Sequence, residues 1–241
     1  MMTVDFYIDS REALEILLSV IAISVALTMV FFTPSGLVQV PKEFILFAGL
    51  CVVTMGSGFV LHEMGHKLTA IAYGANARFR MWTQGLLFML LTSLWGVMFA
   101  APGAVYIYSS HITKKQNGII SLAGPLVNLV VMAVFLFLFF VTPVKVYFSA
   151  LASVPSFFGI KYGLVNVWYL GAAINIMLAV FNMIPAFPLD GSKVLAWNRW
   201  VYLLALLGML AIGAFVLGPG IVISWAVMFA IVLLLSKVFF G

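Results

Sequence analysis

Long apolar runs separated by short polar breaks follow one another along the whole chain, and they predict membrane-spanning helices. Each run approaches or exceeds the roughly 20 residues that a helix needs to cross a bilayer. None shows the alternation of apolar and polar residues that is typical of membrane β-barrels. The pattern predicts an all-α membrane protein, a bundle of about six transmembrane helices forming a single domain over residues 1–241. We expect the spans at about 13–32, 44–73, 118–141, 164–184, 200–217 and 221–239.

The segment between the second and third predicted spans, at about 78–108, follows a different pattern. Its apolar stretch 86–101 is shorter than a span and ends at Pro102-Gly103. The flanking segments 78–83 and 105–108 are rich in residues that favour strands. We therefore predict a small membrane-associated β region or re-entrant segment here, with its backbone polar groups paired against protein or water.

The composition agrees with a membrane protein and excludes an ordinary soluble domain. The chain is 65% hydrophobic and 8% charged, whereas a soluble domain is roughly half apolar and a quarter charged. The net charge of +5 comes mostly from loops, so it indicates topology rather than binding to nucleic acid. A single cysteine, Cys51, excludes an intramolecular disulfide. The lipid bilayer is therefore an expected partner, and no nucleic acid is.

The distribution of Lys and Arg predicts the orientation. Cytoplasmic loops carry an excess of basic residues, and a cytoplasmic N-terminus with six spans places most of the basic residues inside. The expected cytoplasmic residues are Arg11, Lys67, Arg78, Arg80, Lys114, Lys115, Lys193, Arg199 and Lys237, against Lys42, Lys145 and Lys161 outside. We expect a multi-pass protein of the cell membrane in which the ends of the second and fourth spans, at about residues 73 and 184, lie toward the cytoplasm. A further crossing by 86–101 would invert every later span and separate these two ends.

Within the second predicted span lies the pattern His-Glu-x-x-His, formed by His62, Glu63 and His66. Residues four apart share one face of a helix, so both imidazoles can bind one metal ion. Glu63 lies beside that site and can take a proton from water, as in zinc hydrolases. The alternative is a packed bundle that satisfies these side chains. We favour the metal, because ionisable groups within a span are costly and usually functional.

A catalytic zinc site usually has three protein ligands, and Asp190 is the expected third. Of the seven acidic residues, only Glu63 and Asp190 lie near the inner ends of the hydrophobic segments. Pro185 and Pro188 force a bend before Asp190, and Gly191 permits a tight turn. The alternative is an exposed aspartate where a helix ends. We predict one Zn²⁺ per chain, since two imidazoles and a carboxylate suit zinc.

Two further polar residues have less certain roles in the sequence. Asn128 interrupts the otherwise apolar span 118–141. Its amide can donate to a substrate carbonyl or oxyanion, or it can tie two helices together, and the residues leave both open. His111 lies in a polar stretch before two lysines, and we interpret it as a solvated loop residue.

Three motifs together resemble the site-2 protease family of intramembrane zinc metalloproteases. They are the His-Glu-x-x-His of 62–66, the Gly-Pro-x-x-Asn of 124–128 and the Asn-x-x-Pro-x-x-Pro-Leu-Asp-Gly of 182–191. The resemblance covers roughly residues 44–195, and the length is similar to the transmembrane core of a compact archaeal member. It implies a protease that hydrolyses peptide bonds within or near transmembrane segments of membrane-spanning substrate proteins, as in regulated intramembrane proteolysis.

The family pattern also implies the roles of individual residues. His62, His66 and Asp190 would bind zinc, and Glu63 would be the general base. The family has a membrane-associated β region between the motif span and the next, in agreement with the prediction for 78–108.

Two other functions remain as alternatives. Histidine and aspartate inside spans can form the ion pathway of a divalent metal transporter, or the chain can be a non-catalytic metal-binding membrane protein. Against a transporter, the predicted spans hold one cluster of ionisable groups and nothing on the far side. A transporter also gives Glu63 no particular role.

Overall fold

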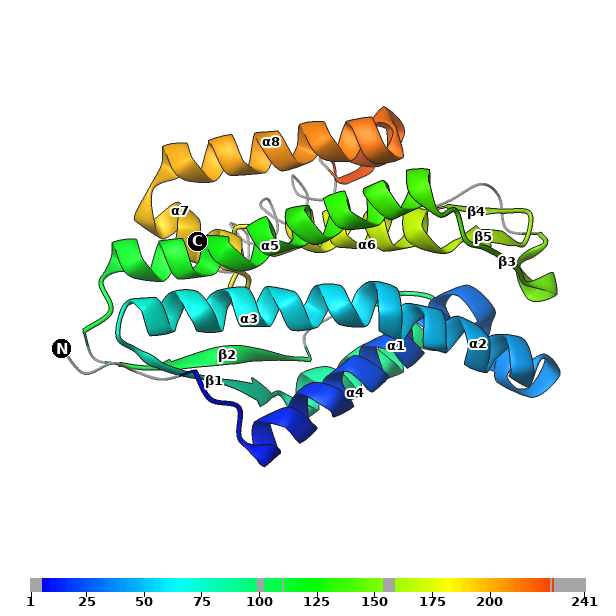
Figure 1. Ribbon diagram of the computed structural model, residues 1–241, viewed down its shortest axis with the longest axis horizontal. Coiled ribbons are helices and arrows are strands. Elements are labelled where there is room, and N and C mark those ends of the chain that lie inside the picture. The colour runs from blue at the N-terminus through cyan, green and yellow to red at the C-terminus, as the bar shows by residue number, and fades with distance from the viewer. Residues whose placement is uncertain (1–5, 99–101, 110, 154–158, 226, 228–241) are drawn as a thin grey trace.

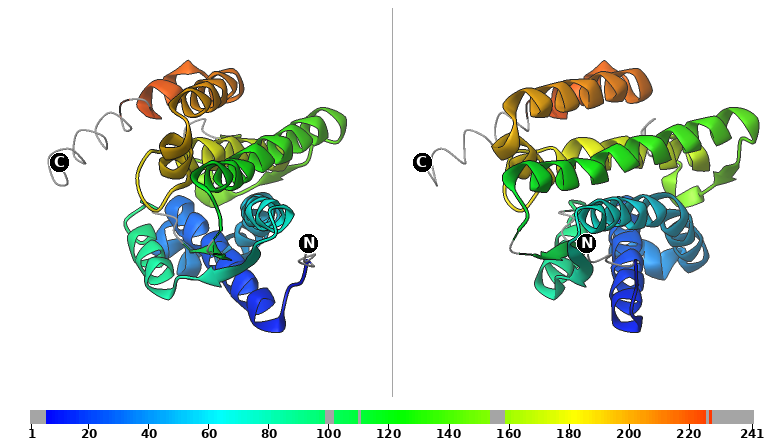
Figure 2. Two further views of the ribbon diagram at one scale, coloured as in Figure 1. Left: turned by 90° about the vertical axis from the view of Figure 1, so that its left-hand side faces the viewer. Right: turned by 60° about the vertical axis from the view of Figure 1, so that its left-hand side comes forward.

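The computed structural model describes residues 6–98, 102–109, 111–153, 159–225 and 227, and the chain is mostly helical (Figure 1). Helices α3 and α5 run side by side through the middle, with α1, α4 and a two-stranded sheet on one flank and α6, α7 and α8 on the other (Figures 1 and 2). The helices are α1 (Ser10–Gln39), α2 (Pro41–Cys51), the π-helical turn η1 (Val52–Gly56), α3 (Ser57–Ala72), α4 (Thr83–Ser93), α5 (Lys114–Val141), the short 3-10 turn η2 (Ser149–Leu151), α6 (Val167–Asn182), α7 (Asp190–Trp197) and α8 (Arg199–Leu217).

Four helical segments are long and apolar enough to cross a membrane, which confirms four of the predicted spans. They are α1, the continuous run α2–η1–α3 over Pro41–Ala72, α5 and α8. The predicted span 164–184 instead begins as a strand and continues as α6, an apolar helix of 16 residues. Most of the predicted span 221–239 lies outside the described residues. By length and composition, the chain is therefore a membrane protein with four candidate spans among the described residues.

The first span ends differently from the prediction. The predicted span ends at residue 32, but the helix bends at Thr33, which has a φ of 56°, and resumes beyond it to Gln39. Proline disfavours the helical conformation in the residue before it and lacks the N–H that would continue the ladder. Thr33-Pro34 therefore bends the chain without ending the helix.

The predicted β region is confirmed, with one addition. Strand β1 (Asn76–Met81) pairs antiparallel with β2 (Gly103–Tyr108), in the register Arg78↔Tyr106 and Phe79↔Val105. Between the strands the apolar stretch folds as helix α4 and packs against α1. A second sheet, which the sequence did not predict, has the order β3-β5-β4 and lies between α5 and α6. Its strands are β3 (Lys145–Tyr147), β4 (Ile160–Lys161) and β5 (Leu164–Asn166).

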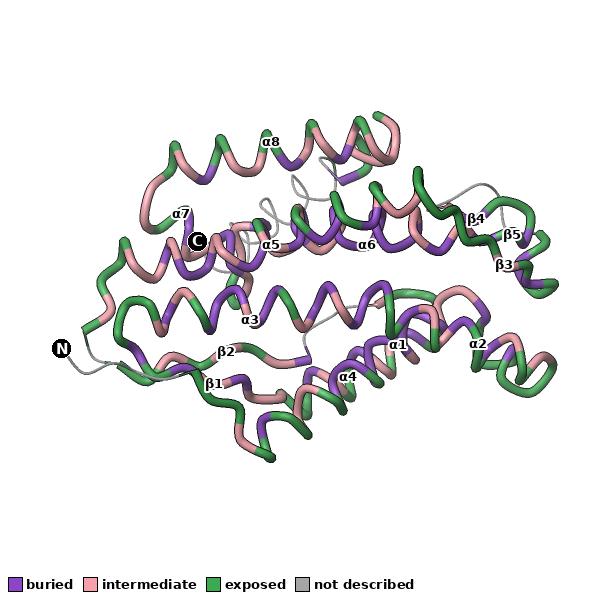
Figure 3. Tube along the Cα trace, viewed as in Figure 1, coloured by how far each residue is buried: buried purple, intermediate pink, exposed green. Residues whose placement is uncertain are grey.

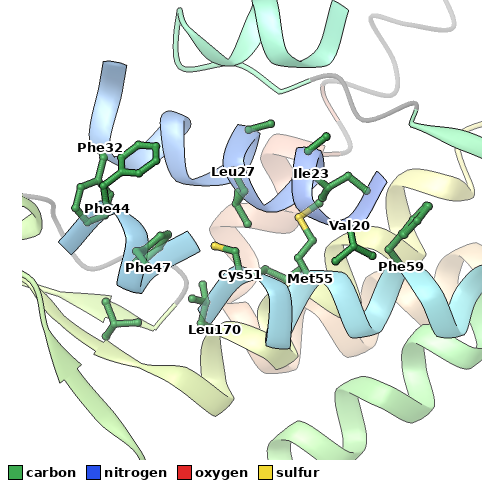
Figure 4. Packing of buried hydrophobic residues seen from close by; sticks show 14 of the residues in the cluster. Val20, Ile23, Leu27, Phe32, Phe44, Phe47, Cys51, Met55, Phe59 and Leu170 are labelled. Atoms are coloured by element: carbon green, nitrogen blue, oxygen red, sulfur yellow. The ribbon is translucent and has the colours of Figure 1, made fainter. Parts of the chain in front are cut away.

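The two largest of three apolar clusters hold most of the helices together. One joins α1 to α2, where Phe32, Phe44 and Phe47 pack edge-to-face or tilted and Cys51 is fully buried, as Figure 4 shows. The other joins α5, α6 and α8. In Figure 3, buried residues concentrate on α6 and on the facing sides of α3 and α5, while α8 is largely exposed. The most buried part of the bundle therefore lies where α3, α5 and α6 meet.

A buried ion pair fixes α1 against α3 and β1. Lys67 Nζ lies 2.7 Å from both carboxylate oxygens of Glu12, and each side chain is 1% exposed. Lys67 also donates to the Tyr7 carbonyl, and Glu12 accepts from the Phe79 backbone N–H. Lys67 follows His66 directly, so this pair also ties the end of the motif helix to the first span.

We predict that Glu12→Ala lowers the free energy of unfolding by about 3–5 kcal/mol, because it leaves the Lys67 ammonium buried without its partner. Arg11→Ala is the control: its ion pair with Glu15 has a side chain that is 75% exposed, and such pairs contribute at most about 1 kcal/mol. Denaturant unfolding of both variants in detergent measures the difference. Equal losses for both variants would contradict the structural role of the pair.

Candidate metal centre

The structure brings His62, His66 and Asp190 together. Helix α3 presents the two imidazoles one turn apart, and their Nε2 atoms are 3.0 Å from each other. Asp190, the first residue of α7, places Oδ2 at 3.3 Å from His62 Nε2 and 3.1 Å from His66 Nε2. All three residues are buried.

Close backbone packing delivers Asp190 to this point. After α6 ends, the proline-containing loop 183–189 turns back, and α7 begins against α5. A Cβ on Gly191 would collide with the main chain of Met183, so only glycine permits this approach. On α5, a Cβ on Gly124 would lie 2.5 Å from His66 Nε2 and 2.6 Å from His62 Nε2. The absence of that methyl group leaves room for the imidazole pair.

The hydrogen bond that each imidazole makes through Nδ1 determines whether its Nε2 carries a proton or a lone pair. His62 Nδ1 lies 2.6 Å from Asn128 Oδ1, and His66 Nδ1 lies 2.7 Å from the Ile120 carbonyl oxygen. Both partners are oxygen acceptors, so both Nδ1 atoms carry the proton. A neutral imidazole then has its lone pair on Nε2.

Two nitrogen lone pairs and a carboxylate oxygen consequently converge from 3.0–3.3 Å with no proton donor between them. A single bound cation would relieve the repulsion among these three acceptors. Ligand atoms about 2.0 Å from a shared tetrahedral zinc would lie about 3.3 Å apart, which matches these separations. The residues present therefore fit Zn²⁺.

Glu63 directly follows His62 on α3 and lies beside this cluster. The side chain is buried, and among the described residues Oε2 has no hydrogen-bond partner. It lines a cavity of about 300 Å³ together with His62, His66 and Asp190. A carboxylate in this position can accept a proton from water that enters the cavity.

Strand β2 forms one wall of the cavity, since residues 103–107 line it. The two edges of the β1–β2 sheet differ. On β1, the outward backbone N–H groups of Phe79 and Met81 donate to Glu12 and Glu15 of α1. On β2, the edge away from β1 pairs with no strand among the described residues.

Asn128 does not lie in the cavity wall. It is fully buried, its Oδ1 faces His62, and its Nδ2 donates to the Gly58 carbonyl and to Asn175 Oδ1. All of its polar atoms are occupied between helices, which favours the helix-tying alternative over donation to an oxyanion. His111 is exposed, as expected, and lies outside the cavity lining.

Three residues of this region were not assigned a role from the sequence. Asn182 and Lys193 line the cavity, and Lys193 Nζ is 3.5 Å from Asp190 Oδ1, the oxygen turned away from the imidazoles. Asn182 stands in the motif that contains Asp190, which was a usable signal. No signal in the sequence pointed to Asn175, because a single amide in an apolar helix has no spacing that connects it to the motif.

Comparison with known proteins agrees with this chemistry. The model of peptidase family M50 matches residues 50–200. A Methanocaldococcus jannaschii protein, whose name provisionally assigns it as a zinc metalloprotease, is 35% identical over 211 residues, 86% of this chain and 94% of its own length. A second protein of that organism, named a zinc metalloprotease, is 28% identical over 150 residues, 62% of this chain and 34% of its own length.

No solved structure shows significant similarity to the chain. The family model nevertheless spans more than half of the sequence and includes all three residues of the cluster. With the long match to the first relative, this establishes that the chain is a metalloprotease and belongs to peptidase family M50, the family of the site-2 proteases.

Proposed function

We propose that the chain is an intramembrane zinc metalloprotease, which hydrolyses peptide bonds within or near transmembrane segments of other proteins. The observation that carries the proposal is the convergence of the lone pairs of His62, His66 and Asp190 beside the unpaired oxygen of Glu63. This cluster draws its histidines from a helix long and apolar enough to span a bilayer. A protease so placed acts on peptide segments that share the membrane with it.

Each residue of the cluster has a defined role in this proposal. His62, His66 and Asp190 would hold one Zn²⁺, which when bound supplies Lewis acidity to the scissile carbonyl and the attacking water. Glu63 accepts the proton of the water and returns it to the nitrogen of the leaving amine. Asn182 has two amide hydrogens, one donated to the Leu178 carbonyl; the other is available to a substrate carbonyl.

The proposed substrate site is the free edge of β2, by addition of an extended strand. A transmembrane helix hides its carbonyls in its own hydrogen bonds, so the cleaved stretch must unwind, and helix-weakening residues such as Gly favour this. Three features support β2: its residues line the cavity, its far edge is unpaired, and the opposite edge of β1 is occupied by carboxylates of α1.

The orientation belongs to the same proposal. The excess of Lys and Arg at the ends of the spans expected inside, including Lys114 and Lys115 before α5, supports a cell-membrane protein with its active site toward the cytoplasm. Water would then enter the cavity from that side. The bilayer and a membrane-spanning protein substrate are the proposed partners.

A divalent metal transporter remains the second candidate, and one observation disfavours it. Within the described residues, His62, His66 and Asp190 form the one cluster of three potential ligands. A transport pathway needs further polar positions across the membrane. The transporter also leaves the unpaired Glu63 oxygen unexplained.

We predict that Glu63→Gln retains one zinc per chain and lowers cleavage of a transmembrane model substrate by about 100- to 10,000-fold, the usual contribution of a general base. The measurement pairs metal analysis with a cleavage assay in detergent. Glu43→Gln is the matched control, because Glu43 lies in the first turn of α2, is partly exposed and accepts a hydrogen bond from Ser149 rather than lining the cavity. Undiminished cleavage by Glu63→Gln would contradict the assigned base, and zinc-dependent ion flux without cleavage would favour the transporter.

We predict that Val105→Pro weakens substrate binding, while Val105→Ala preserves most of it. In the β1–β2 register, Val105 opposes Phe79, whose N–H points away from β2; the Val105 N–H therefore points to the free edge. Proline removes that donor, and an edge strand tolerates it. Loss of one hydrogen bond should lower kcat/KM by up to about tenfold, mainly through KM, with zinc content unchanged. Equal kinetics for the two variants would exclude strand addition at this position.

A further inference from the structure

Two fully buried asparagines connect the candidate metal centre to the interior of the helix bundle. Asn128 comes from α5 and Asn175 from α6, and both are 0% exposed. Asn128 Nδ2 donates to Asn175 Oδ1 at 3.0 Å, and Asn128 Oδ1 faces His62 Nδ1 at 2.6 Å. A continuous line of side-chain hydrogen bonds thus runs from α6 through α5 to the imidazole on α3.

Two backbone carbonyls fix the orientation of the Asn175 amide, where this line of hydrogen bonds begins. Asn175 Nδ2 lies 2.9 Å from the Gly171 carbonyl and 3.3 Å from the Thr54 carbonyl. A carbonyl oxygen only accepts, so the amide nitrogen of Asn175 must point to these two atoms. Its oxygen therefore points to Asn128 and can only accept there.

The orientation of Asn128 follows from the same rule. Its Nδ2 donates to Asn175 Oδ1 and, at 3.1 Å, to the Gly58 carbonyl. A reversed Asn128 amide would set its oxygen against two other acceptors. The remaining Asn128 Oδ1 then faces His62, so His62 Nδ1 carries the proton and His62 Nε2 carries the lone pair.

We propose that Asn175 is a positioning residue of the metal centre: it sets the amide orientation of Asn128, and through it the tautomer of His62 that presents Nε2 to the metal. This rests on the proposed function only in that the site binds zinc. Outer partners that fix the tautomer of a metal-binding histidine commonly raise metal affinity. Asn175 would raise metal affinity through Asn128, without contacting the imidazole itself.

The backbone around Asn175 is shaped for this contact. Thr54 belongs to the π-helical turn η1, where the hydrogen-bond pattern departs from that of the α-helix. A Cβ on Gly58 would collide with the Asn175 amide, so glycine is required where α3 approaches α6. The π-helical turn therefore supplies a hydrogen-bond acceptor to the Asn175 amide, and Gly58 leaves the space that this amide occupies.

The first experiment measures zinc affinity by chelator competition in detergent, a quantity independent of proteolysis. We expect Asn128→Leu to weaken zinc binding by about 10- to 100-fold, and Asn175→Leu by about tenfold, the lower end of that range. Thr54→Val is the matched control: its hydroxyl is buried in the same region but donates only to the Leu50 carbonyl. It should bind zinc as the wild type does.

A spectroscopic readout separates positioning from general loosening of the bundle. The chain has three histidines, so selective ¹⁵N-histidine labelling gives few signals. In the zinc-free wild type and in Thr54→Val, His62 should show one tautomer with a protonated Nδ1. In Asn175→Leu it should show both tautomers in exchange. In an Asn128→Asp background, either carboxylate oxygen accepts from Nδ1, and Asn175→Leu should then leave the His62 tautomer unchanged.

The outcomes separate this inference from the proposed function. An unchanged zinc affinity and a single His62 tautomer in Asn175→Leu would overturn the positioning role while leaving the protease intact. Zinc binding with the expected losses, but no cleavage of any membrane-spanning substrate by the wild type, would overturn the proposed function and leave the positioning role standing. Equal weakening of zinc binding by Thr54→Val and Asn175→Leu would show that Asn175 contributes to the packing of the helices and not to positioning.

Discussion

The organisation of this protein depends on three acceptors that face one another inside an apolar bundle. His62 Nε2, His66 Nε2 and Asp190 Oδ2 lie 3.0–3.3 Å apart, each with a lone pair directed at the others. In a medium that solvates charge poorly, this arrangement is unfavourable unless a cation occupies the centre. Helices α3 and α7 supply these atoms, and the packing of both helices against α5 brings them together.

The remaining buried polar groups follow from the same constraint. A bilayer offers them no water, so each needs a protein partner. The Asn128 and Asn175 amides are satisfied by one another, by His62 and by backbone carbonyls, and the Lys67–Glu12 pair takes the Phe79 N–H into its network. Among the described residues, three buried side-chain atoms lack a hydrogen-bond partner: Ser24 Oγ, Arg80 Nη1 and Glu63 Oε2. Of these three residues, Glu63 is the one that lines the cavity together with His62, His66 and Asp190.

The sequence predicted the parts of the structure that are governed by local patterns. The spacing of His62 and His66 gave their common helix face, and the scarcity of acidic residues near the inner span ends singled out Asp190. Contacts between distant segments were not accessible in this way. The burial of Lys67, the second sheet and the role of Asn175 each depend on which helix packs against which. Apolar length likewise could not show that the chain would continue as a helix beyond the kink at Thr33.

Zinc K-edge X-ray absorption on the purified protein, combined with metal stoichiometry, would show whether His62, His66 and Asp190 hold a zinc ion. We expect one zinc per chain, with nitrogen and oxygen neighbours at about 2.0–2.1 Å, no sulfur, and an imidazole scattering pattern from two histidines. Asp190→Asn should weaken zinc binding and alter the oxygen shell. A protein purified without any divalent metal, and unable to take one up, would contradict the account and leave the two histidines and the aspartate as packing residues.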